Sequence, residues 1–214
     1  MFVVWVRVPP VLLKMKHKPC LKLRKPKWGV GINDILESSQ APHIKPFYKT
    51  WQNLIMRCYN PSFQKGRYVV YRGYTVHPDW HKFSNFKTWM EKQDWQGKEL
   101  DKDVLGEGEK IYSPDTCAFV SIYTNRVFRK FERKNRNIKI DTRQPHYKNR
   151  KRYSVCISKF GKVKYFGHYY TIEEAKKEER KPYSQYIREL SDYETDPRIK
   201  AKLLKIADKI EYDS

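Results

Sequence analysis

LDKDVLGEGEKIYSPDTCAFVSIYTNR, residues 100–126, is the stretch of sequence that decides the fold. Apolar residues near its two ends predict short strands over residues 100–105 and 117–120, joined by a loop at Gly106–Pro114. A helix is expected to follow from about Ser121. The inward-facing residues of that helix are Tyr123, Val127 and Phe128. The stretch therefore predicts two strands followed by a helix.

Two amphipathic helices are expected before this stretch. The first ends near Asn60-Pro61, and its apolar face consists of Phe47, Trp51, Leu54, Ile55 and Cys58. The second carries Phe83, Phe86, Trp89 and Met90. Between the helices, a short strand or hairpin is expected across Tyr68–Val76, turning at Arg72-Gly73.

The C-terminal part predicts a small antiparallel sheet packed on a helix. Apolar and small polar residues alternate over residues 153–158, Phe160-Gly161-Lys162 is expected to turn, and the strand Val163–Tyr170 returns. Thr171 and Glu174 have the spacing of a capping box, which marks a helix start. Pro182 is expected to break that helix. A last helix is expected from Asp196-Pro197. Its apolar stripe is Ile199, Leu203, Ile206, Ala207 and Ile210.

The positive charge is concentrated in two segments. The formal net charge is +21, and residues 1–27 contribute eight Lys or Arg and no acid. Residues 126–164 hold 15 Lys or Arg against Glu132 and Asp141. Concentrated cations are favoured where a protein displaces counterions from phosphates, so a nucleic acid is the expected partner. A basic linker in a soluble protein is the alternative reading. Aromatic residues interleaved with the cations, as in Arg152-Tyr153, favour nucleic-acid binding.

The composition favours two small domains, because 39% apolar residues in 214 support only a small core. We expect an α+β chain with a basic, poorly ordered segment at residues 1–45, a first domain at 46–131, a basic linker at 132–150 and a separable second domain at 151–214. The four cysteines form no CxxC pair and no secretory signal is apparent, so no disulfide framework is expected. Met1–Leu13 is too short to span a bilayer, and the protein is expected to be cytoplasmic.

Three segments of the first domain resemble phage HNH-like homing endonucleases. They read WQNLIMRCYNP (51–61), YRGYTVHPDWHKFSNFKTWM (71–90) and LDKDVLGEGEKIYSPDTCAFVS (100–121), and the resemblance covers residues 47–128. It implies a small ββα-metal module with flanking helices. It also implies double-stranded DNA as the partner and cleavage in the cytoplasm of a host cell.

The resemblance implies a site for a divalent cation, Mg²⁺ or Mn²⁺, that would hold the scissile phosphate. Asp101 matches the metal ligand on the strand and Asn125 the ligand on the helix. Lys102 occupies the position of the general-base histidine, and Thr116 that of an asparagine that ties down the loop. Lysine is a poor base unless burial lowers its pKa, and Asp103 is a candidate second ligand or base. Alternatively, Asp101 and Asp103 are solvated loop carboxylates.

A structural zinc ion is a separate hypothesis. Metal-ligand residue types can occur in such relatives at the positions of Cys58, His77 and Cys117, and thiolate and imidazole are zinc ligands. The alternative is that both cysteines are small buried residues.

Residues 152–190, which open with RYSVCISKFGKVKYFGHYYTIEEAKKE, resemble the plant Apetala-type (ethylene-response-factor-like) DNA-binding domain. The resemblance implies that the exposed sheet face reads the major groove. The matched positions are Ser154, Cys156, Ser158, Val163 and Tyr165. The expected phosphate contacts are Arg126, Arg129, Lys130, Arg150, Arg152, Lys159, Lys162 and Lys164. Cations outnumber base-reading side chains here, which favours phosphate binding over sequence reading.

The leading interpretation is a DNA-binding, HNH-like endonuclease of phage or mobile-element type. A non-catalytic DNA-binding protein on the same scaffold is the second interpretation. An RNA-binding protein is the third, because basic and aromatic segments also stack single strands.

Overall fold

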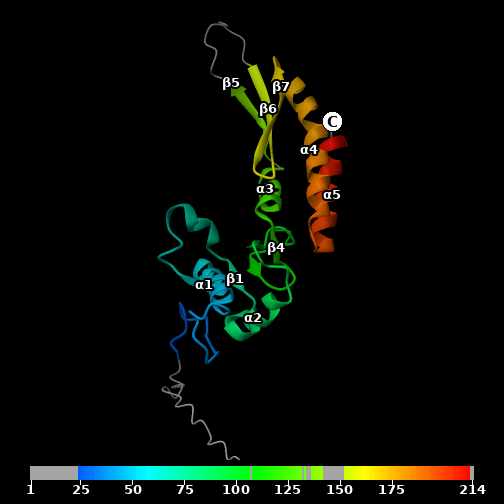
Figure 1. Ribbon diagram of the computed structural model, residues 1–214. Coiled ribbons are helices and arrows are strands. Elements are labelled where there is room, and N and C mark those ends of the chain that lie inside the picture. Colours follow the sequence, from blue (N-terminus) through cyan, green and yellow to red (C-terminus); the bar gives the residue numbers. More distant parts are fainter. Residues whose placement is uncertain (1–23, 107, 132, 134–135, 142–151, 213–214) are drawn as a thin grey trace, which may run out of the picture.

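The computed structural model describes residues 24–212 except 107, 132, 134–135 and 142–151, and it has an α+β fold with small sheets (Figure 1). The helices are α1 (Lys45–Tyr59), α2 (Phe83–Glu91), α3 (Ile122–Lys130), α4 (Ile172–Asp192) and α5 (Pro197–Tyr212), with 3₁₀ helices η1 (Gly66–Tyr71) and η2 (Pro78–His81). The strands are β1 (Thr75–Val76), β2 (Glu99–Asp101), β3 (Ile111–Tyr112), β4 (Ala118–Val120), β5 (Ile138–Asp141), β6 (Arg152–Lys159) and β7 (Lys162–Tyr169). No helix among the described residues is long and apolar enough to cross a membrane.

The first apolar core lies around α1 and α2, as their periodicity predicted. Trp51, Ile55, Phe83 and Phe86 are fully buried in it. The indole of Trp51 donates a hydrogen bond of 2.7 Å to the Trp80 carbonyl, so this large ring is satisfied as well as buried. The α1 helix ends at the predicted place, with Asn60 as its C-cap.

The expectation of a poorly ordered N-terminal segment is wrong for residues 24–45, while residues 1–23 lie outside the described part. Ile32 forms a parallel bridge with Lys82, and Asp34 accepts hydrogen bonds from the Ser84 backbone and hydroxyl. Gly31 lies so close to Trp51 that an added Cβ would come within 3.0 Å of the ring. This segment is therefore packed against the first core.

Of the short strand or hairpin predicted across Tyr68–Val76, the hairpin is wrong, and the short strand is present as β1 at Thr75–Val76. Residues Gly66–Tyr71 form η1, and β1 pairs in parallel with β3, with Thr75 opposite Ile111. β3 interrupts the expected loop at Gly106–Pro114. Two-residue strands more than 30 positions apart carry no periodic signal, because their pairing is set by tertiary packing.

The predicted strand–strand–helix order of residues 100–126 is confirmed. β2 pairs antiparallel with β4 in the register Glu99 with Val120 and Asp101 with Ala118. β2 is shorter than expected, because residues 102–105 form a turn. The Ser121 hydroxyl caps α3 by accepting from the Thr124 backbone N–H at 3.1 Å.

The C-terminal sheet has the order β5-β6-β7. β6 and β7 form the predicted hairpin, and Phe160 and Gly161 at its turn both have positive φ, as a tight two-residue connection requires. The linker predicted over residues 132–150 is corrected at Ile138–Asp141. These residues form β5, with Ile138 opposite Val155. Pairing with β6 stabilises a strand that the local sequence pattern does not predict. Residues 142–150 lie outside the described part.

The α4 helix runs unbroken through Pro182, which corrects the predicted break, and it begins with the predicted Thr171–Glu174 capping box. A proline inside a helix costs about 3 kcal/mol. Buried residues on both sides of it, Ala175 before and Tyr183, Ile187 and Leu190 after, hold the helix together.

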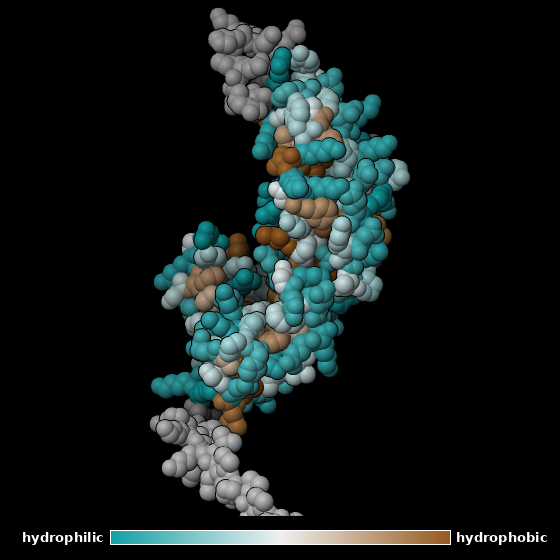
Figure 2. Space-filling model, in the orientation of Figure 1, coloured by the Kyte–Doolittle hydropathy of each residue, from teal (hydrophilic) through white to brown (hydrophobic). Residues whose placement is uncertain are grey.

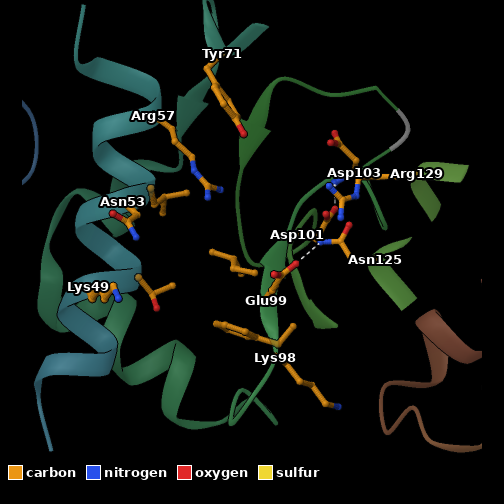
Figure 3. Close-up of a pocket in the computed structure, with 14 residues that line it drawn as sticks. Lys49, Asn53, Arg57, Tyr71, Lys98, Glu99, Asp101, Asp103, Asn125 and Arg129 are labelled. Atoms are coloured by element: carbon orange, nitrogen blue, oxygen red, sulfur yellow. Dashed lines mark hydrogen bonds between the residues drawn. The ribbon is translucent and has the colours of Figure 1, made fainter. Parts of the chain in front are cut away.

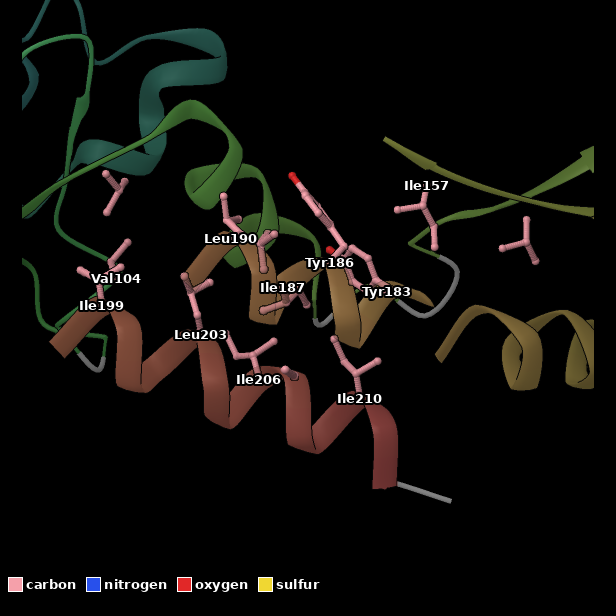
Figure 4. Close-up of a cluster of buried hydrophobic side chains, with 14 of the residues drawn as sticks. Val104, Ile157, Tyr183, Tyr186, Ile187, Leu190, Ile199, Leu203, Ile206 and Ile210 are labelled. Carbon is pink, nitrogen blue, oxygen red and sulfur yellow. The ribbon is translucent and has the colours of Figure 1, made fainter. Parts of the chain in front are cut away.

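The second apolar core crosses the predicted domain boundary. Ile199, Leu203 and Ile206 of α5 pack with α4 and β6, and the same cluster contains Val104, Ala118, Val120 and Val127. Figure 4 shows Val104 beside Ile199. Lys202 strengthens this contact by donating a hydrogen bond of 2.6 Å to the Val104 carbonyl. The second core is therefore built from residues of both predicted domains.

Candidate active site and nucleic-acid interface

A cavity of about 660 Å³ lies between α1 and the β2–β4–α3 unit. The α1 wall contributes Lys49, Asn53 and Arg57, which are spaced one helical turn apart on the face opposite Trp51 and Ile55. The other wall contributes Glu99, Asp101, Asp103, Asn125 and Arg129. Figure 3 shows both groups of side chains around the cavity. Cations thus face a cluster of oxygen donors.

Strand geometry places Glu99 and Asp101 on the same face of β2, because side chains alternate along a strand. Asn125, on the first turns of α3, lines the same cavity and is only 8% exposed. Its amide nitrogen donates a 2.8 Å hydrogen bond to Glu99 Oε2. The structure thus brings Asp101 and Asn125, the two predicted metal ligands, to one cavity, and adds Glu99.

Asp101 is half-buried, which corrects the alternative that it is a solvated loop carboxylate. Its Oδ1 accepts hydrogen bonds from the backbone of Asp103 at 2.8 Å and of Val104 at 3.2 Å. Burial is the largest effect on its pKa and raises it, and these two backbone bonds oppose the rise. Asp103, in contrast, has an exposed carboxylate that pairs with Lys102.

Lys102 does not occupy the position of a base. It is 4% exposed, lies 4.3 Å from the centre of the Tyr74 ring, and donates to the Glu109 carbonyl at 3.1 Å. It is also not among the side chains that line the cavity. Burial lowers the pKa of its ammonium, but Asp103 and Tyr74 more than offset this, so the net shift is upward. The predicted catalytic role of Lys102 is therefore corrected to a buried, charged structural role.

A substitution of Lys102 tests whether this position reaches the cavity. Lys102→His is expected to give no increase in DNA nicking, because a side chain at position 102 lies away from the cavity. Nicking rates of wild type and variant on supercoiled plasmid measure this directly. A general base typically contributes about 10²–10⁴-fold, so a rise of that size would show that position 102 does reach the reacting groups.

Thr116 ties the loop together where the resemblance places an asparagine. Its hydroxyl donates a hydrogen bond of 2.8 Å to the Ile111 carbonyl and accepts one of 3.0 Å from the Ser113 N–H. The turn between β3 and β4 is therefore fixed by a side chain of different type.

The zinc hypothesis gains no support from the geometry. Among the described residues, no group of three or more His, Cys, Asp or Glu side chains is placed to hold a metal ion. Cys58 and Cys117 are buried, and burial raises the pKa of each thiol to about 12. The half-exposed His77 instead caps η2 by accepting from the Asp79 N–H. These features fit small buried cysteines and a helix-capping histidine.

The predicted DNA-reading face is present only in part. Val163 and Tyr165 are 70% and 52% exposed, and Tyr165 pairs with Cys156 across the hairpin. Ser154 is buried and donates to the Lys139 carbonyl, which corrects its reading role. Ser154 lies opposite Lys139 of the neighbouring strand β5, and the register of β6 with β7 shifts between Ser154 and Cys156.

The predicted phosphate-binding cations spread over two surfaces. Arg129 lines the first cavity, whereas Arg126 and Lys130 line a second, of about 170 Å³, with the half-buried Ser158. On the sheet, Lys162 and Lys164 are exposed. Lys159 pairs with Glu189, and Arg152 lies 5.6 Å from the centre of the Tyr170 ring. Arg150 lies outside the described residues.

The sequence analysis missed Glu99 and the polar residues of α1 that line the cavity. The signal for Lys49, Asn53 and Arg57 was their four-residue spacing on the polar side of a strongly amphipathic helix. The signal for Glu99 was its position two residues before Asp101.

The face drawn in Figure 2 is mostly hydrophilic, with scattered hydrophobic residues.

Comparison with known proteins gives no relative: no family model, no curated protein and no solved structure matches the chain.

Proposed function

We propose that the chain is a DNA-binding, HNH-like endonuclease that cleaves phosphodiesters with Mg²⁺ or Mn²⁺. The observation that carries the proposal is the convergence of Asp101 and Asn125, from a strand–strand–helix unit, on a cavity with a cationic opposite wall. The resemblance of residues 47–128 to phage homing endonucleases is consistent with this arrangement.

The oxygen-donor set fits a hard divalent cation. Carboxylate and amide oxygens are the ligands such ions prefer, and Asn125 Oδ1 is a buried atom without a hydrogen-bond partner among the described residues. Asp101 and Asn125 would hold the ion, which would polarise the scissile phosphate and stabilise the leaving oxygen. Lys49, Arg57 and Arg129 would orient the phosphate backbone from the cavity walls.

Incubation of the full chain with supercoiled plasmid and Mg²⁺ or Mn²⁺ tests this function, and relaxed or linear DNA is the expected product. The alternative is a non-catalytic DNA-binding protein, and the buried Lys102 at the position of the family's base favours it. Under that alternative the chain binds duplex DNA and leaves the plasmid intact. Competition with single-stranded RNA separates both from the third interpretation, an RNA-binding protein.

Duplex binding is expected to depend steeply on salt, because residues 126–164 concentrate positive charge. If about five of these cations meet phosphates, log K should fall with log[salt] at a slope of roughly −4 to −5. Fluorescence anisotropy of a labelled duplex measures the slope. Arg129→Ala should reduce its magnitude by about 1, whereas Lys205→Ala, an exposed cation on α5, should not change it. A slope near zero in the wild type would refute the electrostatic argument.

A further inference from the structure

Glu99 and Asn125 form a polar contact in the wall of the cavity. Glu99 Oε2 accepts from Asn125 Nδ2 at 2.8 Å, which joins β2 to α3 (Figure 3). Glu99 is exposed, whereas Asn125 is 8% exposed. The contact therefore lies between a side chain that reaches solvent and one that is held inside.

This contact determines which way the Asn125 amide points. An ionised carboxylate only accepts hydrogen bonds, so the amide must present its nitrogen to Glu99. The carbonyl oxygen Oδ1 is then directed away from Glu99, and it is buried without a partner among the described residues. A buried acceptor without a partner is unfavourable in a folded protein. Such an atom, in a residue that lines a cavity, is an acceptor that a ligand can use.

Asp101 supplies the second donor. Both of its backbone hydrogen bonds use Oδ1, and the residue lies on the same face of β2 as Glu99. Asn125 and Asp101 line one cavity, and amide and carboxylate oxygens are donors of the type that binds Mg²⁺ or Mn²⁺.

We propose that Glu99 is a positioning residue, which fixes the Asn125 amide so that Oδ1 is oriented to bind a hard divalent cation beside Asp101. The proposal rests on the proposed function and deepens it, because it adds a residue that supports the metal ligand.

Isothermal titration calorimetry of Mn²⁺ alone into the full chain, without DNA, tests the proposal. Glu99→Ala removes the acceptor and should weaken Mn²⁺ binding by about 10–100-fold, the usual effect of losing a residue that orients a metal ligand. Glu99→Gln can offer either its oxygen or its nitrogen to Asn125, so it fixes the amide less firmly than the carboxylate, and Mn²⁺ affinity should fall between that of wild type and that of Glu99→Ala. In the absence of metal, Glu99→Gln should melt close to the wild-type temperature. Glu99→Ala should melt at a lower temperature, because it leaves the buried Asn125 nitrogen without its partner.

The outcomes separate this inference from the function on which it rests. If wild type binds no Mn²⁺, the proposed metal-dependent function fails, and this inference fails with it. If wild type binds and Asp101→Asn loses binding while Glu99→Ala does not, only the inference is overturned. If Glu99→Gln and Glu99→Ala both abolish Mn²⁺ binding as completely as Asp101→Asn, the Glu99 carboxylate is itself a ligand, and the positioning role is wrong.

Discussion

A fragment of residues 140–214 is expected not to fold, although the sequence alone predicted a separable domain at 151–214. The fragment lacks Val104, Ala118, Val120 and Val127, which belong to the core that α4 and α5 complete. It also cuts β5 in half, since that strand spans Ile138–Asp141.

The fragment also leaves a buried charge without its partners. Glu179 is 3% exposed and accepts hydrogen bonds from Arg136 at 3.0 Å and from Asn137 at 2.6 Å. Both partners lie before residue 140. Removing the partners of a buried ion typically costs about 3–5 kcal/mol, which is a large part of the stability of a small domain.

Circular dichroism during thermal unfolding measures the result. The fragment is expected to show no cooperative transition. A longer fragment, residues 98–214, restores the whole second core together with Arg136 and Asn137, and is expected to unfold cooperatively. A cooperative transition in residues 140–214 would show that the shared core is dispensable.

Elements whose signal is local could be predicted from the sequence. The apolar periodicity of α1, α2 and α5 and the capping box at Thr171 each involve residues within a few turns of one another, and the structure confirms them. Asp101 and Asn125 were found through the order and spacing of a motif, and both line the cavity.

Features that depend on distant partners could not be predicted. β5 is ordered by pairing with β6, and α4 tolerates Pro182 because buried residues flank it. The orientation of Lys102 follows from the end of β2 at Asp101 and from the position of Tyr74, which the strand pattern did not contain. The Glu99–Asn125 bond joins residues 26 positions apart.

The second large effect is expected at Asp101. Asp101→Asn keeps the shape of the side chain and an oxygen that can accept the Asp103 and Val104 N–H bonds, but removes the negative charge that would hold the cation. Charge stabilisation by a bound metal ion is worth several kcal/mol, and each 1.36 kcal/mol is a factor of ten in rate. Nicking is therefore expected to fall by about 10²-fold or more, while duplex binding at fixed salt stays close to wild type.

The conversion of supercoiled plasmid to nicked or linear DNA, followed over time with Mg²⁺, with Mn²⁺ and with a chelator, tests the central claim most directly. Wild type is expected to nick the plasmid only with a divalent cation, and Asp101→Asn purified in parallel is expected to leave it supercoiled. Nicking of equal rate by wild type and Asp101→Asn, or an intact plasmid with the wild type under every condition, would contradict the assignment of this cavity as a nuclease site.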